Sequence, residues 1–256
     1  MNPLRHAKRT ALALGIALFG STIIGHTSLA KDKDVIPATA LAQPELEQAI
    51  NWLRKAKENH TAVKDYKCTL VSQEFVNGKL QEPSYIQLKM KTDPFSVHMR
   101  WIAPEKSKGT EVVFALGKNN NKMRVKSSLL PNGPGIWVNI DTNDKRVMQH
   151  SRHTILETGI GNMIEQSLAQ CEKDKKAGNA TVKIAEYMCN NKACYRLEIV
   201  RQGKDAYCPK SIIFLEKESK LPIRVDNYQA NGELLESFSY VNLEFNTGLT
   251  AADFNK

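Results

Sequence analysis

The fold is decided by the stretch DNYQANGELLESFSYVNLEFN, residues Asp226–Asn246. It predicts two β-strands joined by a turn at Asn231-Gly232, because an Asn-Gly pair between two apolar runs is typical of a tight hairpin. Similar strand-like runs, about eleven in all, recur from Tyr66 onward with short turns between most of them. Consecutive strands joined by short turns pair in antiparallel order, so the sequence predicts one broad antiparallel sheet.

Two segments have helical periodicity instead of strand alternation. The first, PELEQAINWLRKAKENH, spans residues 44–60. The second carries an apolar stripe at helical spacing: Ile160, Ile164, Leu168 and Cys171. Both helices must bury their apolar side against the sheet, and a sheet this wide curls instead of staying flat. The predicted fold class is α+β, with a large curved antiparallel sheet that forms an incomplete β-barrel and helices packed on its concave face.

An apolar cavity is expected on that concave face. A curled sheet that two helices cannot fill leaves a crevice, and apolar crevices bind ligands. The predicted ligand-binding residues are the inward-facing apolar side chains of three strands and the second helix: Ile86, Leu88, Met90, Val97, Met99, Trp101, Val112, Phe114, Leu116, Ile160 and Ile164. The alternative for each of them is a filled core.

The first thirty residues have the pattern of a secretory signal peptide. Arg5, Lys8 and Arg9 precede an apolar run over residues 11–25, and small residues lead to a cleavage position after Ala30. A membrane anchor is the alternative, but the run is shorter than the roughly 20 residues that span a bilayer. We therefore expect a cleavable signal peptide (1–30), a linker (31–41) and a single domain (42–256) in the periplasm.

The net charge bears on the partners. The chain carries a formal charge of +9, and removal of Arg5, Lys8 and Arg9 lowers it to +6. This charge suits transient contact with an anionic membrane surface or an acidic partner, and the alternative is that it only aids solubility. Nucleic acid is not an expected partner, because the protein is predicted to be exported and has no nucleic-acid-binding motif. The oligomeric state is not predicted.

Five cysteines in an oxidising compartment favour disulfide formation. In YMCNNKACY, residues 187–195, Cys189 and Cys194 lie on the same face of a predicted hairpin, a separation compatible with a disulfide. Half of a metal site is the alternative, but no second Cys or His pair has ligand spacing. Cys171 falls on the helical stripe and is a candidate free core thiol, which leaves Cys68 and Cys208 as a second pair by elimination; the sequence does not fix the pairing of these three cysteines.

No catalytic motif is present: the chain lacks a G-x-S-x-G elbow, an H-E-x-x-H pair and a glycine-rich phosphate loop. His150 and His153 could share a helical face, but no third ligand accompanies them, so no metal site and no cofactor are expected. Four acidic candidates pair with nothing in the sequence: Asp141, Asp144, Glu157 and Asp253. The protein is therefore predicted not to be an enzyme.

The segment RHTILE contains two further signals. Thr154 and Glu157 have the spacing of a capping box and predict the start of a helix. Arg152 and His153 at this helix entry are candidate contacts for an anionic headgroup or, as the alternative, for a nearby carboxylate.

Several segments together resemble the exported bacterial family known as domain of unknown function 1571. They are KTDPFSVHMRWIAPEKSKGTEVVFALGKNNNKM, RHTILETGIGNMIE, KLPIRVDNY and FSYVNLEFNTGLTAADF, and they cover roughly residues 66–254. That family is similar to the lipoprotein carriers LolA and LolB and to the periplasmic regulator RseB. The resemblance implies an incomplete antiparallel barrel closed by helices, with an apolar cavity for acyl chains. It implies no catalytic residue.

The strand and helix pattern and the family resemblance together predict a periplasmic lipid-binding or lipoprotein-carrier protein. Its predicted partner is an acyl lipid or a lipidated protein. The alternative is a protein-interaction or regulatory module of the RseB type. A third hypothesis is an unrecognised envelope enzyme, and a metal tightly bound by His150 and His153 would favour it.

Overall fold

A computed structural model describes residues 44–126, 135–203 and 207–256, which all belong to one compact unit, Thr39–Lys256. The predicted signal peptide (1–30) and linker (31–41) lie outside the described residues. The strands are β1 Asp65–Val76, β2 Lys79–Leu80, β3 Ser84–Lys91, β4 Ser96–Ala103, β5 Glu111–Ala115, β6 Met123–Lys126, β7 Trp137–Ile140, β8 Ala180–Cys189, β9 Lys192–Arg201, β10 Lys210–Glu216, β11 Pro222–Tyr228 and β12 Leu234–Phe245. The helices are α1 Pro44–His60, α2 Lys145–Met148 and α3 Ile160–Ala177, with 3-10 turns η1 Glu105–Ser107, η2 Asn119–Asn121, η3 Ile155–Glu157 and η4 Ala251–Phe254.

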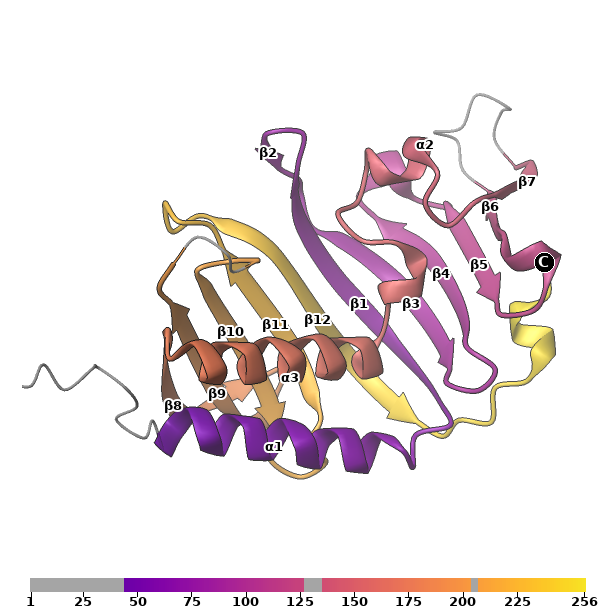
Figure 1. Cartoon of the computed structure of the whole chain (residues 1–256). Helices are drawn as coiled ribbons and strands as arrows, with labels where there is room; N and C mark the ends of the chain where they lie inside the picture. Colours follow the sequence, from indigo (N-terminus) through magenta and orange to yellow (C-terminus); the bar gives the residue numbers. More distant parts are fainter. Residues whose placement is uncertain (1–43, 127–134, 204–206) are drawn as a thin grey trace, which may run out of the picture. The chain divides into compact units, whose positions relative to one another are not determined.

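The twelve strands form one unclosed sheet in the order β7-β6-β5-β4-β3-β1-β12-β11-β10-β9-β8, with β2 paired to β1 (Figure 1). Every pairing is antiparallel. The first long strand pairs with the last, so that Leu70 lies opposite Tyr240 in the middle of the sheet. The predicted fold class is confirmed: α+β, with an incomplete antiparallel barrel.

The hairpin of the opening stretch is longer than an Asn-Gly turn. Asp226 pairs with Ser237, and the register then shifts between Asn227 and Tyr228, where β12 bulges at its extra residue Leu235. The turn closes with a hydrogen bond from the Gln229 amide to the Glu233 carbonyl, 2.8 Å long. Asn-Gly therefore sits inside a wider loop, which explains why the two strands exist as predicted while their junction differs.

Helices α1 and α3 cover the sheet face over β8–β10 (Figure 1). The stripe of α1 is buried as its spacing predicts, with Leu46, Ile50 and Leu53 at most 4% exposed. Gly161 allows α3 to approach α1 closely, because a Cβ at this position would lie only 2.7 Å from the His60 ring. One apolar cluster joins both helices to the three strands: Leu46, Ala49, Ile50, Leu53, Leu168, Cys171, Ala180, Val182, Leu197, Ile199, Ile213 and Leu215.

The opposite sheet face is covered locally. Leu249 and Phe254, at the C-terminal end of the chain, pack on Val113 of β5. Asp253 of η4 pairs with Lys89 of β3 at 2.8 Å. The chain after β12 thus runs back across the outer face and leaves the inner face to α1, α3 and the segment before α3.

The predicted disulfide is not formed in the structure. Cys189 and Cys194 share the outer face as expected, but the register places Cys194 opposite Tyr187 and Cys189 opposite Lys192. The two thiols are therefore diagonal neighbours across the hairpin, and all five cysteines are free and buried. Cys171 is a free core thiol, as predicted. Within the described ranges no helix combines the length and the apolar character needed to cross a bilayer.

Candidate functional site

A cavity of about 1040 Å³ lies on the inner face of the sheet. The strands supply its floor, and its opposite wall consists of α3 and the segment between β7 and α3, called here the strap (residues 141–159), which contains α2 and η3. Figure 1 shows the strap in front of β3 and β4. The large apolar and tyrosine side chains of the lining are Leu70, Ile86, Met99, Trp101, Val112, Met123, Val125, Val147, Ile155, Met163, Ile213, Val225, Phe238, Tyr207 and Tyr240.

The floor is ordered in rows across neighbouring strands. Tyr66, Met90, Val97 and Phe114 follow one another across β1, β3, β4 and β5 and form what we call the filled row. A second row, called the hollow row, contains Leu70, Ile86 and Trp101 from three of these strands. Both rows belong to one buried cluster, but the cavity lies over the hollow row, and no member of the filled row lines it.

This ordering divides the predicted ligand-binding residues. Ile86, Met99, Trp101 and Val112 line the cavity. Six others belong to the same buried cluster but do not line the cavity: Leu88, Met90, Val97, Phe114, Ile160 and Ile164. Leu116 is 53% exposed, because β5 ends at Ala115 and the alternation does not continue beyond the strand.

At the filled row the side chains form a packed core, because the first turn of α3 lies directly against them. The Ile160 amide donates a 3.0 Å hydrogen bond to the Tyr66 hydroxyl. Gly159, at φ 110°, lets the chain come so close that an added Cβ would meet the Met90 methyl at 2.6 Å and the Tyr66 oxygen at 2.9 Å. The space above these side chains is therefore filled by the helix.

A third row, beyond the hollow row, is polar. Glu74 of β1 lies directly opposite Glu236 of β12, which in turn lies opposite Asn227 of β11. Like charges opposite one another on adjacent strands are destabilising, so this pair needs compensating cations or donors. The strap supplies them through Ser151, Arg152 and His153.

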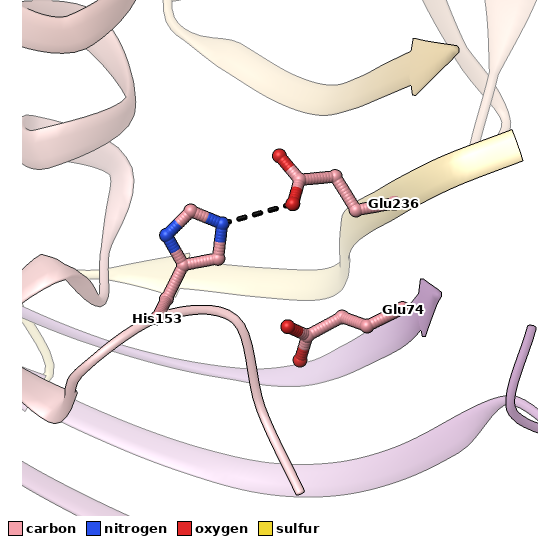
Figure 2. Close-up of side chains that lie close together, drawn as sticks. All are labelled: Glu74, His153 and Glu236. Carbon is pink, nitrogen blue, oxygen red and sulfur yellow. Dashed lines mark hydrogen bonds and ion pairs between the residues drawn. The ribbon is translucent and has the colours of Figure 1, made fainter. Parts of the chain in front are cut away.

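Glu236 is the centre of the resulting cluster and is only 2% exposed. His153 Nε2 lies 2.9 Å from its Oε2, a contact drawn in Figure 2, and Arg152 Nε lies 3.2 Å from the same oxygen. The Tyr207 hydroxyl donates to Oε2 at 2.7 Å, and Asn227 Nδ2 donates to Oε1 at 2.7 Å. The carboxylate is therefore saturated with donors.

Glu74 is held by the strap. The Arg152 amide donates to its Oε2 at 2.7 Å, and the Ser151 hydroxyl lies 3.2 Å from both carboxylate oxygens. Two strands of the floor thus hold the strap, β1 through Glu74 and β12 through Glu236. Figure 2 shows both glutamates beside His153.

The pKa shifts follow from burial and from these contacts. Burial lowers the pKa of His153, but the hydrogen bond and charge of Glu236, helped by the charge of Glu74, outweigh it and raise the pKa to about 9. Burial raises the pKa of Glu74, and the Arg152 amide opposes this only in part. Burial also acts to raise the pKa of Glu236, yet the donors from His153 and Tyr207 hold it below the usual value.

A second buried ion pair supports the cavity wall. Arg201 of β9 and Asp174 of α3 lie 2.7 Å apart, with side chains only 3% and 2% exposed. Arg201 also donates to the Ser211 hydroxyl at 2.8 Å, and Gln170 donates to Asp174 at 2.7 Å. These bonds anchor α3 to the sheet beside the cavity.

The RHTILE segment differs from expectation in two respects. The box formed by Thr154 and Glu157 is present, with the Thr154 amide donating to Glu157 at 2.7 Å, but it begins η3, and α3 starts at Ile160. Arg152 contacts the carboxylate of Glu236, which was the alternative to a headgroup contact. His153 lines the cavity, whereas Arg152 does not. His150 is exposed and is not part of the group of potential metal ligands. That group consists of Glu74, His153 and Glu236.

Sequence reasoning missed Glu74, Tyr207 and Glu236. A signal for Glu236 was present, since in LESFSY it alternates with Phe238 and Tyr240 and so falls on the apolar face. A charged residue on a face that is otherwise apolar indicates either a partner or a site. Nothing local could indicate that Glu74, His153 and Glu236 meet, because they come from three distant parts of the chain.

Residues 63–256 match the family described as protein of unknown function DUF1571, and the chain belongs to this family. No curated protein matches the sequence. Among solved structures, the chain is similar to an uncharacterized conserved protein from Thermus thermophilus, with 12% identity and a TM-score of 0.48 over 82% of this chain and 93% of that one. The Pseudomonas aeruginosa MucA/MucB complex gives 13% identity and a TM-score of 0.47 over 82% and 61%. The Mycobacterium tuberculosis lipoprotein LppX gives 9% identity and a TM-score of 0.46 over 82% and 99%.

Proposed function

We propose that the protein is a periplasmic binding or carrier protein for an acyl lipid or a lipidated protein, and that it holds its cargo without changing it chemically. The observation that carries this proposal is the cavity of about 1040 Å³ over the hollow row. Small-molecule sites are concave, largely apolar and of roughly 300–1,000 Å³, with a few polar groups that fix orientation.

The lining supports an amphipathic cargo. Along β1 the inner face passes from Leu70 through Ser72 to Glu74, that is, from apolar to charged within one strand. An acyl chain over the hollow row gains about 0.8 kcal/mol for each methylene removed from water, so about ten methylenes supply about 8 kcal/mol before the ordering costs. The polar end of the cargo would then face the cluster around Glu236 and His153.

The compartment is part of the proposal. The signal-peptide pattern of residues 1–30 supports export, and a charge of +6 after its removal suits approach to an anionic membrane surface. A carrier must take up and release its cargo at such a surface.

The test uses one substitution that behaves differently in a cavity and in a core. Ser72→Phe places a ring on the cavity floor, between the hollow row and the polar row. In a filled core the added ring costs about 1–3 kcal/mol, whereas in a cavity it is accommodated and displaces ligand. Leu116→Ala is the matched control, since Leu116 was expected in the cavity but is exposed outside it.

Native mass spectrometry of protein purified without detergent, followed by organic extraction, would detect bound lipid. Titration with a dansyl-labelled fatty acid would measure uptake by the delipidated protein. We expect wild type and Leu116→Ala to bind the probe and Ser72→Phe to lose at least about tenfold in affinity with an unchanged melting temperature. A wild-type protein that stays empty with the probe, with phospholipids and with lipopeptides would refute lipid binding and favour a protein-interaction module.

A further inference from the structure

Three potential metal ligands meet at the polar end of the cavity. Ligand atoms of Glu74, His153 and Glu236 all lie within 4.8 Å of one another, and the residues come from β1, the strap and β12 (Figure 2). One imidazole and two carboxylates are a donor set that divalent transition metals accept. The group lines the cavity, so it can be reached from there.

The spacing suits an ion. Two ligand atoms at about 2.1 Å from a tetrahedral metal are about 3.4 Å apart. His153 Nε2 and Glu236 Oε2 are 2.9 Å apart, so a metal can replace their hydrogen bond once the two atoms separate by about half an ångström. A Glu74 carboxylate oxygen lies within 4.8 Å of both of these atoms, and hydrogen bonds from Ser151 and the Arg152 amide hold that carboxylate beside them.

All three side chains are oriented by further hydrogen bonds. His153 Nδ1 lies 3.4 Å from Glu157, whose other oxygen is fixed by the Thr154 amide, and this leaves Nε2 directed toward Glu236. Asn227 holds the second oxygen of Glu236 at 2.7 Å. A carboxylate behind the histidine and a donor behind the acidic ligand are the usual supports of a protein metal site.

The charge balance points the same way. The two facing carboxylates and Glu157 carry three negative charges, and Arg152 carries one positive charge. With a neutral imidazole as ligand the formal charges sum to two negative units, which one divalent ion compensates. Buried and partly buried charges are stable when they are compensated in this way.

We propose that His153 Nε2, Glu236 Oε2 and Glu74 form a binding site for a divalent transition-metal ion, with Zn²⁺ as the best chemical match. Imidazole with carboxylates favours Zn²⁺ over Ca²⁺ or Mg²⁺, which prefer oxygen ligands alone. The open coordination position faces the cavity, where water or an anionic group of the cargo completes the shell. This site does not depend on the proposed lipid binding.

The experiment is equilibrium dialysis of the delipidated, EDTA-treated protein against ZnCl₂ at neutral pH, with the bound metal counted by mass spectrometry. Co²⁺ gives a parallel readout, because its visible absorption bands report coordination by nitrogen and oxygen. We expect a single Zn²⁺ per chain in the wild type. His153→Gln and Glu74→Gln should each weaken binding by at least about tenfold.

His98→Gln is the matched control. His98 Nε2 lies 3.1 Å from Glu111, a similar pair, but Lys126 occupies the place of a second carboxylate at 2.9 Å from Glu111. This variant should keep full metal binding. Absence of Zn²⁺ binding to wild type, or equal binding by wild type, His153→Gln and Glu74→Gln, would overturn the proposal. Because no lipid is present, a protein that binds Zn²⁺ but not the dansyl-labelled fatty acid refutes only the proposed function.

Discussion

The filled row and the hollow row come from the same strands and have similar side chains, yet one is core and the other is the floor of a cavity. Tyr66, Met90 and Phe114 are at most 5% exposed. In the hollow row Leu70 and Ile86 are equally buried, and only Trp101 is partly exposed, but all three line the cavity. The difference lies in what covers them: the first turn of α3 sits on the filled row, and the strap bridges over the hollow row. Strand alternation decides which face a side chain takes, but the covering segment decides whether that face is filled.

The largest effect should come from truncation in the filled row. Phe114 is 2% exposed and contacts Phe95, with ring centroids 6.0 Å apart. Phe114→Ala should lower the free energy of unfolding by about 3–5 kcal/mol, because it leaves a void that the core cannot refill. Urea denaturation measures this, and a loss below about 1 kcal/mol would mean that the row is not closely packed.

An intermediate effect is expected where the two rows are separated. Gly159→Ala places a side chain at φ 110° and at 2.6 Å from the Met90 methyl, so the backbone or Met90 must shift. We expect a loss of about 1–3 kcal/mol in stability. Thermal unfolding with and without the dansyl-labelled fatty acid would measure both the destabilisation and any opening of the cavity toward the filled row. Gly178→Ala, also at positive φ but with open space around it, is the control for strain without contact.

A smaller stability effect with a clear binding effect is expected in the hollow row. Trp101→Ala removes a ring that already borders empty space, so no new void is created and the loss should stay below about 2 kcal/mol. Affinity for the dansyl-labelled fatty acid should fall about tenfold, which corresponds to about 1.4 kcal/mol. A stability loss as large as that of Phe114→Ala would remove the distinction between the two rows.

The smallest effect is a pH dependence at the helix pair. Burial lowers the pKa of His60, and the charge of Glu165 offsets this only in part. Within the described residues His60 Nε2 has no hydrogen-bond partner. The unfolded chain therefore takes up the proton first, so stability should decline as pH falls below about 6.5. Urea unfolding at neutral and mildly acidic pH should show a steeper decline for wild type than for His60→Gln, and parallel curves would contradict the assignment.

Much of the fold could be predicted because alternation and helical stripes are local signals. The stripe Leu46–Leu53 and the strand Ile86–Met90 lie where their periods place them. The junction at Asn231 could not be predicted, since the bulge at Leu235 of β12 depends on how this strand pairs with β11.

The candidate site was only partly predictable for the same reason. Ile86, Met99, Trp101 and Val112 were placed on the correct face, but their separation from Leu88 and Phe114 depends on where the strap crosses the sheet. The cluster around Glu236 depends on contacts between segments far apart in the chain. The disulfide between Cys189 and Cys194 was inferred from a shared face, whereas the hairpin register offsets the two thiols diagonally.

The pairing of β1 with β12 has a consequence for the order of synthesis. The chain is synthesised from its N-terminus, and β1 lies between β3 and β12 in the sheet. The edge of β1 that pairs with β12 therefore stays unpaired until nearly the whole sequence has been made. Until then one edge of β1 is open, and exposed strand edges are sites of aggregation. A nascent chain of this protein should therefore depend on a holding chaperone up to the moment when β12 emerges. A product truncated before Leu234 should aggregate, whereas the full chain, which contains β12 and the segment packed on Val113, should remain monodisperse.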